Sequence, residues 1–222
     1  LSGEHELSSI NELSYSLPSN AHVSMGTVRV LVVGLFDGLG GIRIAYRKLN
    51  KYVVVMCYVS SEIDKVAKRV VRKHWPGVLE WGSVETVSDD VVCKLSQVLS
   101  TQIDHVMIGG GSPCQDLSSL NAHRLGLAGP RSSLFYRIPC IVKSFQKHFH
   151  KVDYFVENVF SMAPTESEKF NKVLGIIPYM VDGADFCGAT RRRLYWCSWK
   201  LHASPHVVLS QHKQYIHVSV HV

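Results

Sequence analysis

The chain has 222 residues, of which 46% are apolar and 19% charged, and its mean hydropathy is +0.06. This composition excludes a disordered, collagen-like or fibrous chain and suits one globular α/β domain. No stretch approaches the roughly 18 consecutive apolar residues of a membrane span, so we expect no membrane contact. The 24 Lys and Arg against 18 Asp and Glu give a net charge of +6. That balance suits a polyanionic partner such as nucleic acid and is also common among ordinary basic enzymes.

The charge is distributed unevenly. Residues 1–27 hold three acids and no Lys or Arg, whereas residues 28–201 hold 23 bases and 15 acids. Residues 1–27 also show no sustained hydrophobic period, so we expect a flexible leader there. The six cysteines are scattered and form no C-x-x-C pair, which favours reduced thiols in a cell interior.

From residue 28 onward, apolar runs alternate with segments of helical period. Strands are predicted at residues 28–36, 52–60, 78–84, 104–109, 153–157, 179–186 and 193–199. Helices are predicted at residues 41–50, 63–74, 89–100, 133–149 and 166–174. Regular alternation of this kind predicts an α/β fold with a mostly parallel sheet and helices on both faces. Ligands of such sheets bind beyond the carboxyl ends of the strands, so the chemistry is expected there.

The end of the chain, residues 202–222, has no convincing period, and we expect an irregular tail. His202 and His206 lie near Cys197, but their spacing matches no common zinc pattern. We therefore expect solvated histidines and no metal site.

The first strand-to-helix junction is rich in glycine. Residues 30–41 read V-L-V-V-G-L-F-D-G-L-G-G, and such glycines let a ligand approach the backbone and the following helix N-terminus. The spacing is not G-x-G-x-x-G, because Arg43 stands where the last glycine would be, so a tight turn without a ligand is the alternative. Glu62 ends the next strand, where a carboxylate can accept hydrogen bonds from ribose hydroxyls. Together the two features predict a cofactor that contains a nucleoside.

A cysteine follows the strand predicted at 104–109. Residues 103–118 read I-D-H-V-M-I-G-G-G-S-P-C-Q-D-L-S, which places Cys114 just beyond the strand, behind a glycine run and Pro113. A loop cysteine at the functional edge of a sheet is a candidate nucleophile. The alternative is a small buried apolar residue.

Two further junctions supply charged groups. Y-F-V-E-N-V at 154–159 places Glu157 at the end of an apolar strand, where a carboxyl group is expensive to bury without a partner and could act as a proton donor. A solvated acid is the alternative. A-T-R-R-R-L-Y-W at 189–196 supplies arginines that could bind phosphate and a base edge, although an ordinary basic surface turn remains open for Arg192.

These motifs, in this order and spacing, resemble the C5-cytosine DNA methyltransferases. The resemblance covers roughly residues 28–201, and P-R-S-S-L-F-Y-R at 130–137 belongs to it. Within the family it is similar to the animal de novo type, because of D-L-S-S-L-N at 116–121 and because Ala189 stands where many members have Gln. The resemblance implies a catalytic core at 28–201 with a Rossmann-like, S-adenosylmethionine-dependent methyltransferase sheet, mostly parallel with an antiparallel last strand.

The resemblance also implies a reaction. A methyl group would pass from S-adenosylmethionine to C5 of a flipped-out cytosine in DNA, through a covalent adduct of Cys114 at C6. Glu157 would deliver or share a proton at N3, Arg193 would reach O2, and Arg191 would reach the DNA backbone or the catalytic loop. A nuclear location is implied as well. The implied cofactor-binding residues are Phe36, Asp37, Gly38, Leu39, Gly40, Glu62, Ile63, Ser83, Val84 and Leu134.

Four departures from the family pattern leave alternatives open. Ser83 stands where an Asp usually binds the adenine amine, and one more glycine than expected precedes Ser112. No target-recognition region or closing segment is recognisable in residues 202–222. The alternative function is a catalytically weak or inactive homologue that regulates a second methyltransferase subunit. Methylation of RNA by the same cysteine chemistry and an unrelated nucleotide-binding α/β protein are further alternatives.

Overall fold

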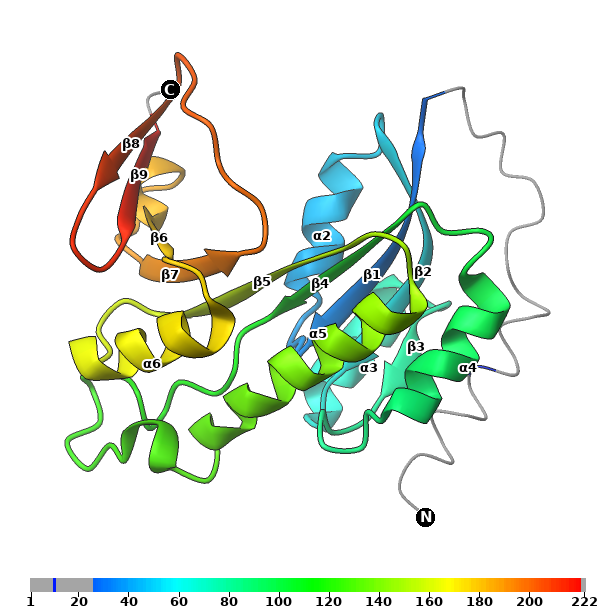
Figure 1. Cartoon of the computed structure of the whole chain (residues 1–222), viewed down its shortest axis with the longest axis horizontal. Helices are drawn as coiled ribbons and strands as arrows, with labels where there is room; N and C mark the ends of the chain where they lie inside the picture. Colours follow the sequence, from blue (N-terminus) through cyan, green and yellow to red (C-terminus); the bar gives the residue numbers. More distant parts are fainter. Residues whose placement is uncertain (1–9, 11–25, 221–222) are drawn as a thin grey trace. The chain divides into compact units, whose positions relative to one another are not determined.

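The computed structural model describes Ile10 and residues 26–220, and it confirms the predicted alternation of strands and helices (Figure 1). The strands are β1 (Val28–Leu35), β2 (Val53–Ser61), β3 (Leu79–Trp81), β4 (His105–Gly110), β5 (Val152–Val159), β6 (Tyr179–Asp182), β7 (Arg192–Cys197), β8 (Val207–Gln211) and β9 (Ile216–Val220). The helices are α2 (Gly41–Lys48), α3 (Lys65–His74), α4 (Asp89–Leu99), α5 (Arg137–His148) and α6 (Pro164–Leu174), with short 3-10 segments η1 (Gly126–Ala128), η2 (Ser132–Tyr136) and η3 (Gly183–Asp185).

The length of the chain alone suggested one core, but the chain divides into two compact units. The first unit comprises residues up to Gly110 together with Cys140–Asp153, and the second comprises Gly111–Pro139 and Tyr154–Val222. The division falls between β4 and the loop that follows it, and within α5 and β5.

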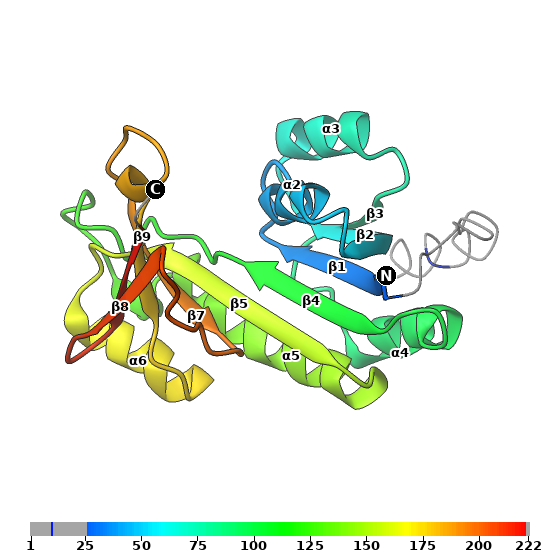
Figure 2. The same ribbon diagram turned by 90° about the horizontal axis from the view of Figure 1, so that it is seen from above.

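The first unit contains a parallel sheet in the order β3-β2-β1-β4. Helices α2 and α3 cover one face, and α4 and α5 lie on the other (Figure 2). The central strand β1 is buried from Val30 to Leu35, as expected for a parallel strand covered on both faces. On the α4 and α5 face, Trp81 packs against Phe145 with ring centroids 6.3 Å apart. Continuous apolar runs in the sequence therefore correspond to the buried strands.

The second unit contains strands in the order β5-β7-β6-β9-β8. Strand β7 is antiparallel to both β5 and β6, which confirms the antiparallel strand expected at this end of a mostly parallel fold. Stacked aromatic rings join α6 to this sheet. The ring centroid of Phe170 on α6 lies 3.9 Å from that of Phe135 and 4.8 Å from that of Trp196 on β7. The indole Nε1 of Trp196 donates a 2.7 Å hydrogen bond to Asn171, which fixes α6 against β7.

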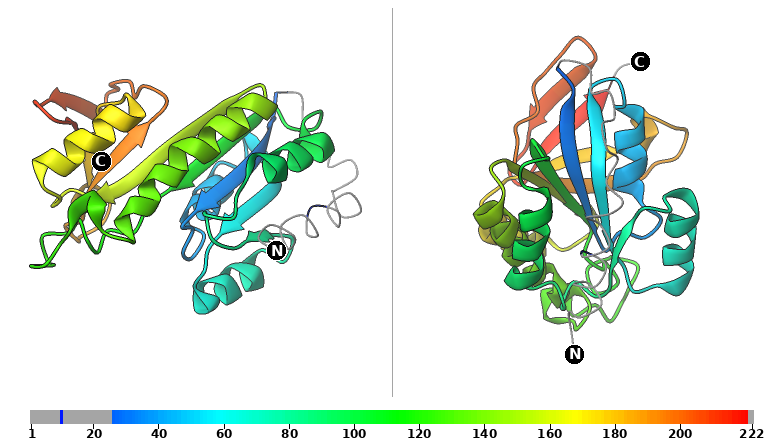
Figure 3. Two further views of the ribbon diagram at one scale, coloured as in Figure 1. Left: turned by 60° about the horizontal axis from the view of Figure 1, so that its bottom comes forward. Right: turned by 90° about the vertical axis from the view of Figure 1, so that its right-hand side faces the viewer.

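The prediction of an irregular tail at 202–222 is wrong. Strands β8 and β9 form an antiparallel hairpin, and β9 pairs in parallel with β6, opposing Ile216 to Tyr179 (Figure 3). Each strand has only five residues, too few for a clear period, and Val218 becomes buried through pairing and packing with a distant strand. In the leader predicted at 1–27, Ile10 is buried, and residues 1–9 and 11–25 lie outside the described residues.

Local hydrogen bonds move several predicted boundaries. The helix predicted at 63–74 begins at Lys65, because the Asp64 carboxylate accepts the N–H of Ala67 at 2.7 Å and caps it. The helix predicted at 133–149 begins only at Arg137, since the preceding residues form a 3-10 turn. The strand predicted at 179–186 ends at Asp182, whose side chain accepts the N–H of Ala184 and starts another turn.

Two negative findings hold for the part of the chain that the structure describes. None of its helices is long and apolar enough to cross a bilayer. The six cysteines all lie in this part, and no disulfide joins them.

Candidate functional site

The carboxylate of Glu62 joins the ends of β1 and β2. Its Oε2 accepts the N–H of Gly38 at 2.8 Å, and its Oε1 accepts the N–H groups of Ile63 and Asp64, each at 2.8 Å. A carboxylate has about four acceptor positions, so capacity remains for an outside donor. Gly38 has a φ of +56°, and a Cβ atom placed on it would meet nothing within 4 Å, so the turn borders open space. The sequence-predicted glycine and acid therefore meet beside a space that a ligand can enter.

Asp37, predicted to line the same site, turns its carboxylate into the protein. It accepts hydrogen bonds from the hydroxyl groups of Ser60, at 2.6 Å, and Tyr58. It also lies against Gly34, because a Cβ atom placed on Gly34 would be 2.0 Å from the Asp37 Oδ1 atom. Burial raises the pKa of Asp37, although both hydroxyl donors act in the opposite direction. Asp37 thus shapes the glycine turn from within.

The remaining residues of the turn differ in exposure. Phe36 has a φ of +51°, a conformation that costs energy for a bulky side chain. Gly40 has a φ of +78°, and a Cβ atom on it would lie 2.8 Å from the Trp75 ring, so only glycine fits where α2 begins. Leu39 and Ile63 are 60% and 72% exposed. These two apolar side chains thus present a surface beside the Glu62 carboxylate.

Ser83 and Val84 follow β3 and lie next to the end of β2. The hydroxyl of Ser61 donates to the carbonyl of Gly82 at 2.9 Å, which fastens the two strand ends together. The Ser83 hydroxyl forms a local turn with Glu85, and Val84 is buried. The first unit therefore gathers nine of the ten predicted cofactor residues at the carboxyl ends of β1, β2 and β3. The tenth, Leu134, lies in η2 of the second unit.

Cys114 lies in the loop that opens the second unit. Its side chain is partly exposed, and its carbonyl accepts the N–H groups of Leu117 and Ser118, so the chain turns directly after it. The Nδ2 group of Asn158 donates to both the carbonyl and the hydroxyl of Ser112 at 3.2 Å. Because Asn158 and Ser112 are both buried, this link anchors the Cys114 loop to the end of β5.

Burial distinguishes Cys114 from two other cysteines. Cys57 and Cys197 are buried, and desolvation raises the pKa of each to about 12, which disfavours the nucleophilic thiolate. Cys114 is partly exposed and follows Pro113 at the edge where the candidate acid lies. Its position therefore favours the nucleophile interpretation over that of a buried apolar residue.

Glu157 on β5 forms an ion pair with Arg193 on β7, with 2.7 Å between Oε1 and Nε. The register opposes Glu157 to Tyr195, so Arg193 is its diagonal neighbour on the same face. The backbone of Gly111 also lies close to the carboxylate, since a Cβ atom on Gly111 would be 2.6 Å from Oε2. Glu157 therefore lies beside Arg193 and beside Gly111. Gly111 belongs to the loop that carries Cys114 and stands three residues before the cysteine.

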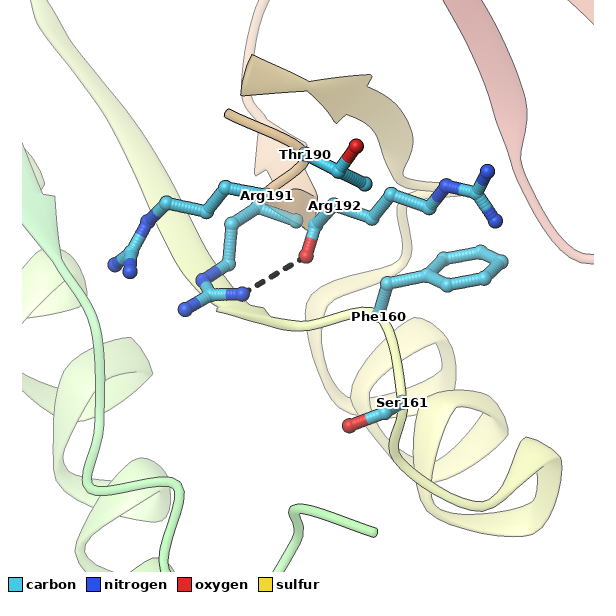
Figure 4. A pocket seen from close by; sticks show the side chains of 6 residues that line it. Phe160, Ser161, Thr190, Arg191 and Arg192 are labelled. Atoms are coloured by element: carbon cyan, nitrogen blue, oxygen red, sulfur yellow. Dashed lines mark hydrogen bonds between the residues drawn. The ribbon is translucent and has the colours of Figure 1, made fainter. Parts of the chain in front are cut away.

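The predicted arginines line a pocket of about 560 Å³ in the second unit. Figure 4 shows Arg191 and Arg192 pointing in opposite directions from the start of β7. Arg192 pairs with Asp182 at 3.0 Å, which supports the interpretation of an ordinary ion pair for this residue. Among the described residues, no acid pairs with the guanidinium of Arg191. The pocket is lined by Phe160, Ser161, Thr190, Arg191, Arg192 and Arg193.

Sequence reasoning missed the residues that fix the Cys114 loop. Arg124 donates to the carbonyl of Ser161 at 3.4 Å, and Glu166 accepts the N–H of Leu127 at 2.7 Å, so the loop is bound to the start of α6. Asn158 was visible as a polar residue on an apolar strand, a pattern that predicts a buried hydrogen bond. Its partner, 46 residues away, was not visible in any local pattern.

The contact between Gly111 and Glu157 leads to a prediction. Gly111→Ala should displace the Glu157 carboxylate, whose flexible end lies 2.6 Å from the new Cβ atom, and should leave the fold intact, because the Glu157 carbonyl at 3.3 Å needs to shift by only a few tenths of an ångström. We expect the rate of the implied methyl transfer to fall about 10- to 100-fold, as it does when a catalytic group is displaced. The melting temperature should be nearly unchanged. Gly77→Ala is the matched control, since a Cβ atom there meets nothing within 4 Å. Equal turnover in the two variants would show that Gly111 does not position the acid.

Comparisons with known proteins point to one family. Residues 30–179 match the family described as C-5 cytosine-specific DNA methylase. The DNA (cytosine-5)-methyltransferase DRM1 of Arabidopsis thaliana is 33% identical over 112 residues, which cover 47% of this chain and 17% of that protein. The type II methyltransferase M.NlaX of Neisseria lactamica is 33% identical over 112 residues, which cover 50% of this chain and 31% of that protein. The chain thus spans less than a third of the length of these relatives.

Among solved structures, DNMT2 of Spodoptera frugiperda aligns with a TM-score of 0.51 and 17% identity, covering 81% of this chain and 54% of that one. The parallel sheet, the glycine turn after β1 and the carboxylate after β2 thus define a protein with the fold of S-adenosylmethionine-dependent methyltransferases. Within this class, the chain belongs to the C-5 cytosine-specific DNA methylase family, whose match covers more than half of it.

Proposed function

We propose that this chain carries the catalytic residues of a DNA cytosine C5-methyltransferase, with Cys114 as nucleophile. The observation that carries the proposal is the contact of Glu157 with both Arg193 and Gly111, which joins the acid, the arginine and the loop of the cysteine in one site. A cytosine ring is a poor electrophile, so a soft nucleophile and a hydrogen-bonding acid must act on it together. The second unit supplies both.

Each residue has a separate role in the proposed reaction. Cys114 forms a bond from its sulfur to C6 of the cytosine, which makes C5 electron-rich. Glu157 interacts at N3 and shares the proton that the ring needs as the adduct forms. Arg193, beside Glu157, hydrogen-bonds O2, the neighbouring atom on the same edge of the ring. After methyl transfer, the C5 proton passes to water and its electron pair re-forms the C5–C6 double bond, while the carbon–sulfur bond breaks and Cys114 leaves as a thiolate. Arg191, which is among the residues that line the pocket, holds the DNA backbone or the catalytic loop.

S-adenosylmethionine, the implied cofactor, supplies an electrophilic methyl group when bound. The first unit fits it in three respects. Glu62 retains acceptor capacity for ribose hydroxyls, the turn at Gly38 borders open space, and the exposed Ile63 suits an apolar planar base. The start of α2 has no side-chain cap, which leaves N–H groups for an anionic ligand. Ser83 lacks the carboxylate expected for the adenine amine, so we expect weaker cofactor binding than an Asp there would give.

Glu62→Gln tests the cofactor site directly. The amide nitrogen would face a backbone N–H group where the carboxylate now accepts one, and a charge-assisted acceptor would be lost. We expect S-adenosylmethionine to bind about 10- to 100-fold more weakly, as for a loss of about 1.5–3 kcal/mol. Titration calorimetry measures this without any turnover. Glu168→Gln, on the surface of α6, is the control, and unchanged binding in Glu62→Gln would remove this residue from the site.

The proposed function is tested by transfer of labelled methyl groups from S-adenosylmethionine. We expect labelled 5-methylcytosine in duplex DNA and far less label in transfer RNA. Weak cofactor binding, as expected from Ser83, without turnover on either substrate would favour the alternative of an inactive regulatory homologue. Addition of an active methyltransferase then shows whether this chain stimulates a second subunit. Similarity to the animal de novo type and a nuclear location remain part of this proposal.

A further inference from the structure

Helix α3 of the first unit is unusually basic. Its ten residues, K-V-A-K-R-V-V-R-K-H, hold five Lys or Arg and no acid. Two of these bases are neutralised locally, because Lys68 and Arg72 both pair with Glu80 of β3, at 3.3 and 2.6 Å. Two other acids precede the helix: Asp64 caps it, and Glu62 accepts the backbone N–H groups of Gly38, Ile63 and Asp64. The three remaining bases, which form no ion pair in the described part of the chain, are Lys65, Arg69 and Lys73.

These three bases are exposed and repeat every four residues, so they line one side of the helix about 6 Å apart. Neighbouring helix α2, on the same face of the sheet (Figure 2), adds exposed Arg47 and Lys48 and contains no acid. On the opposite face, α4 begins with two acids. Helices α4 and α5 together hold four Lys or Arg and two acids, against eight Lys or Arg and no acid in α2 and α3, so positive charge is greater on the α2 and α3 face.

We infer that Lys65, Arg69 and Lys73 form a second contact surface for duplex DNA, one that binds the phosphate backbone without reading sequence. The inference rests on the proposed action on DNA. A row of evenly spaced cations complements a row of phosphates, and each cation that neutralises a phosphate releases a counterion. A membrane surface fits less well, because the apolar side of α3, with Ala67 and Val71, is buried against the protein.

The surface would serve a function that the catalytic residues do not. Contacts to phosphates beyond the target base hold the enzyme on long DNA and help offset the cost of flipping a base. We therefore expect affinity to depend on DNA length, since a longer duplex offers more phosphates for an additional contact surface to bind.

The test compares two triple variants with the same loss of charge. Lys65→Gln/Arg69→Gln/Lys73→Gln removes the surface, and Lys94→Gln/Lys143→Gln/Lys172→Gln removes three exposed lysines from α4, α5 and α6. Binding of labelled 12- and 60-base-pair duplexes is measured by anisotropy at several salt concentrations. For the α3 variant on the long duplex, we expect about 10-fold weaker binding and a salt slope reduced by about 2 to 3. The control variant should keep the wild-type slope.

Three results would overturn the inference: equal weakening in both variants, an unchanged slope in the α3 variant, or tighter binding of wild type to vesicles of phosphatidylserine and phosphatidylcholine than to DNA. The binding readout needs no turnover. Normal methyl transfer with an unchanged slope would reject the α3 surface alone, whereas binding that depends on α3 without methyl transfer would reject the proposed activity alone.

Discussion

Replacing Cys114 with alanine is expected to lower methyl transfer by about four orders of magnitude, because the reaction then lacks the nucleophile that activates C5. The fold should persist, since Cys114 lies in a loop and uses its carbonyl, not its sulfur, to hold the turn. DNA and cofactor should still bind, because neither depends on the thiol. The measurements are turnover with labelled cofactor, DNA affinity and the melting temperature.

A chemical trap makes the result specific. In DNA that contains 5-fluorocytosine, fluorine replaces the C5 proton that must leave before the carbon–sulfur bond can break. Wild-type protein should therefore remain covalently joined to this DNA after denaturation, and Cys114→Ala should not. Cys93→Ala, a partly exposed cysteine on α4, is the control and should still be trapped. A covalent complex that survives in Cys114→Ala would reject the assigned nucleophile.

Breaking the pair of Glu157 and Arg193 is expected to have the second largest effect. Glu157→Gln keeps the size of the side chain, but its amide cannot take up and return a proton as a carboxyl group does. Turnover should therefore fall about 10²- to 10⁴-fold. Arg193→Lys keeps the charge but loses the planar fork that contacts Oε1, and we expect a loss of about 10- to 100-fold. Because the two groups act on one edge of the ring, the double variant should lose much less than the product of the single losses.

Arg192→Lys provides the control for this pair. Arg192 is adjacent on β7 but pairs with Asp182, so turnover should change little. The turnover of all four variants, measured at saturating DNA, gives the coupling between the two residues. Strictly multiplicative losses in the double variant would show that Glu157 and Arg193 act independently, against the arrangement seen in the structure.

Much of the fold and the family could be predicted from the sequence alone. The apolar runs of β1 and β2 and the glycines between β1 and α2 predicted a parallel sheet with a ligand at its carboxyl edge, because burial on both faces and backbone approach each demand particular residue types. The order of the Cys114, Glu157 and Arg193 motifs predicted the family, which the match over residues 30–179 confirms.

Only the tertiary structure decided which groups meet. Glu157 and Arg193 are 36 positions apart in the chain, and Asn158 and Ser112 are 46 apart, so no local pattern contains either contact. The hairpin of β8 and β9 was missed for the same reason, since its short strands are stabilised by pairing with β6. Residue type follows from burial and backbone conformation, which act locally and leave a pattern in the sequence. Contact depends on how distant strands pair, and the chain sets that pairing only when it folds.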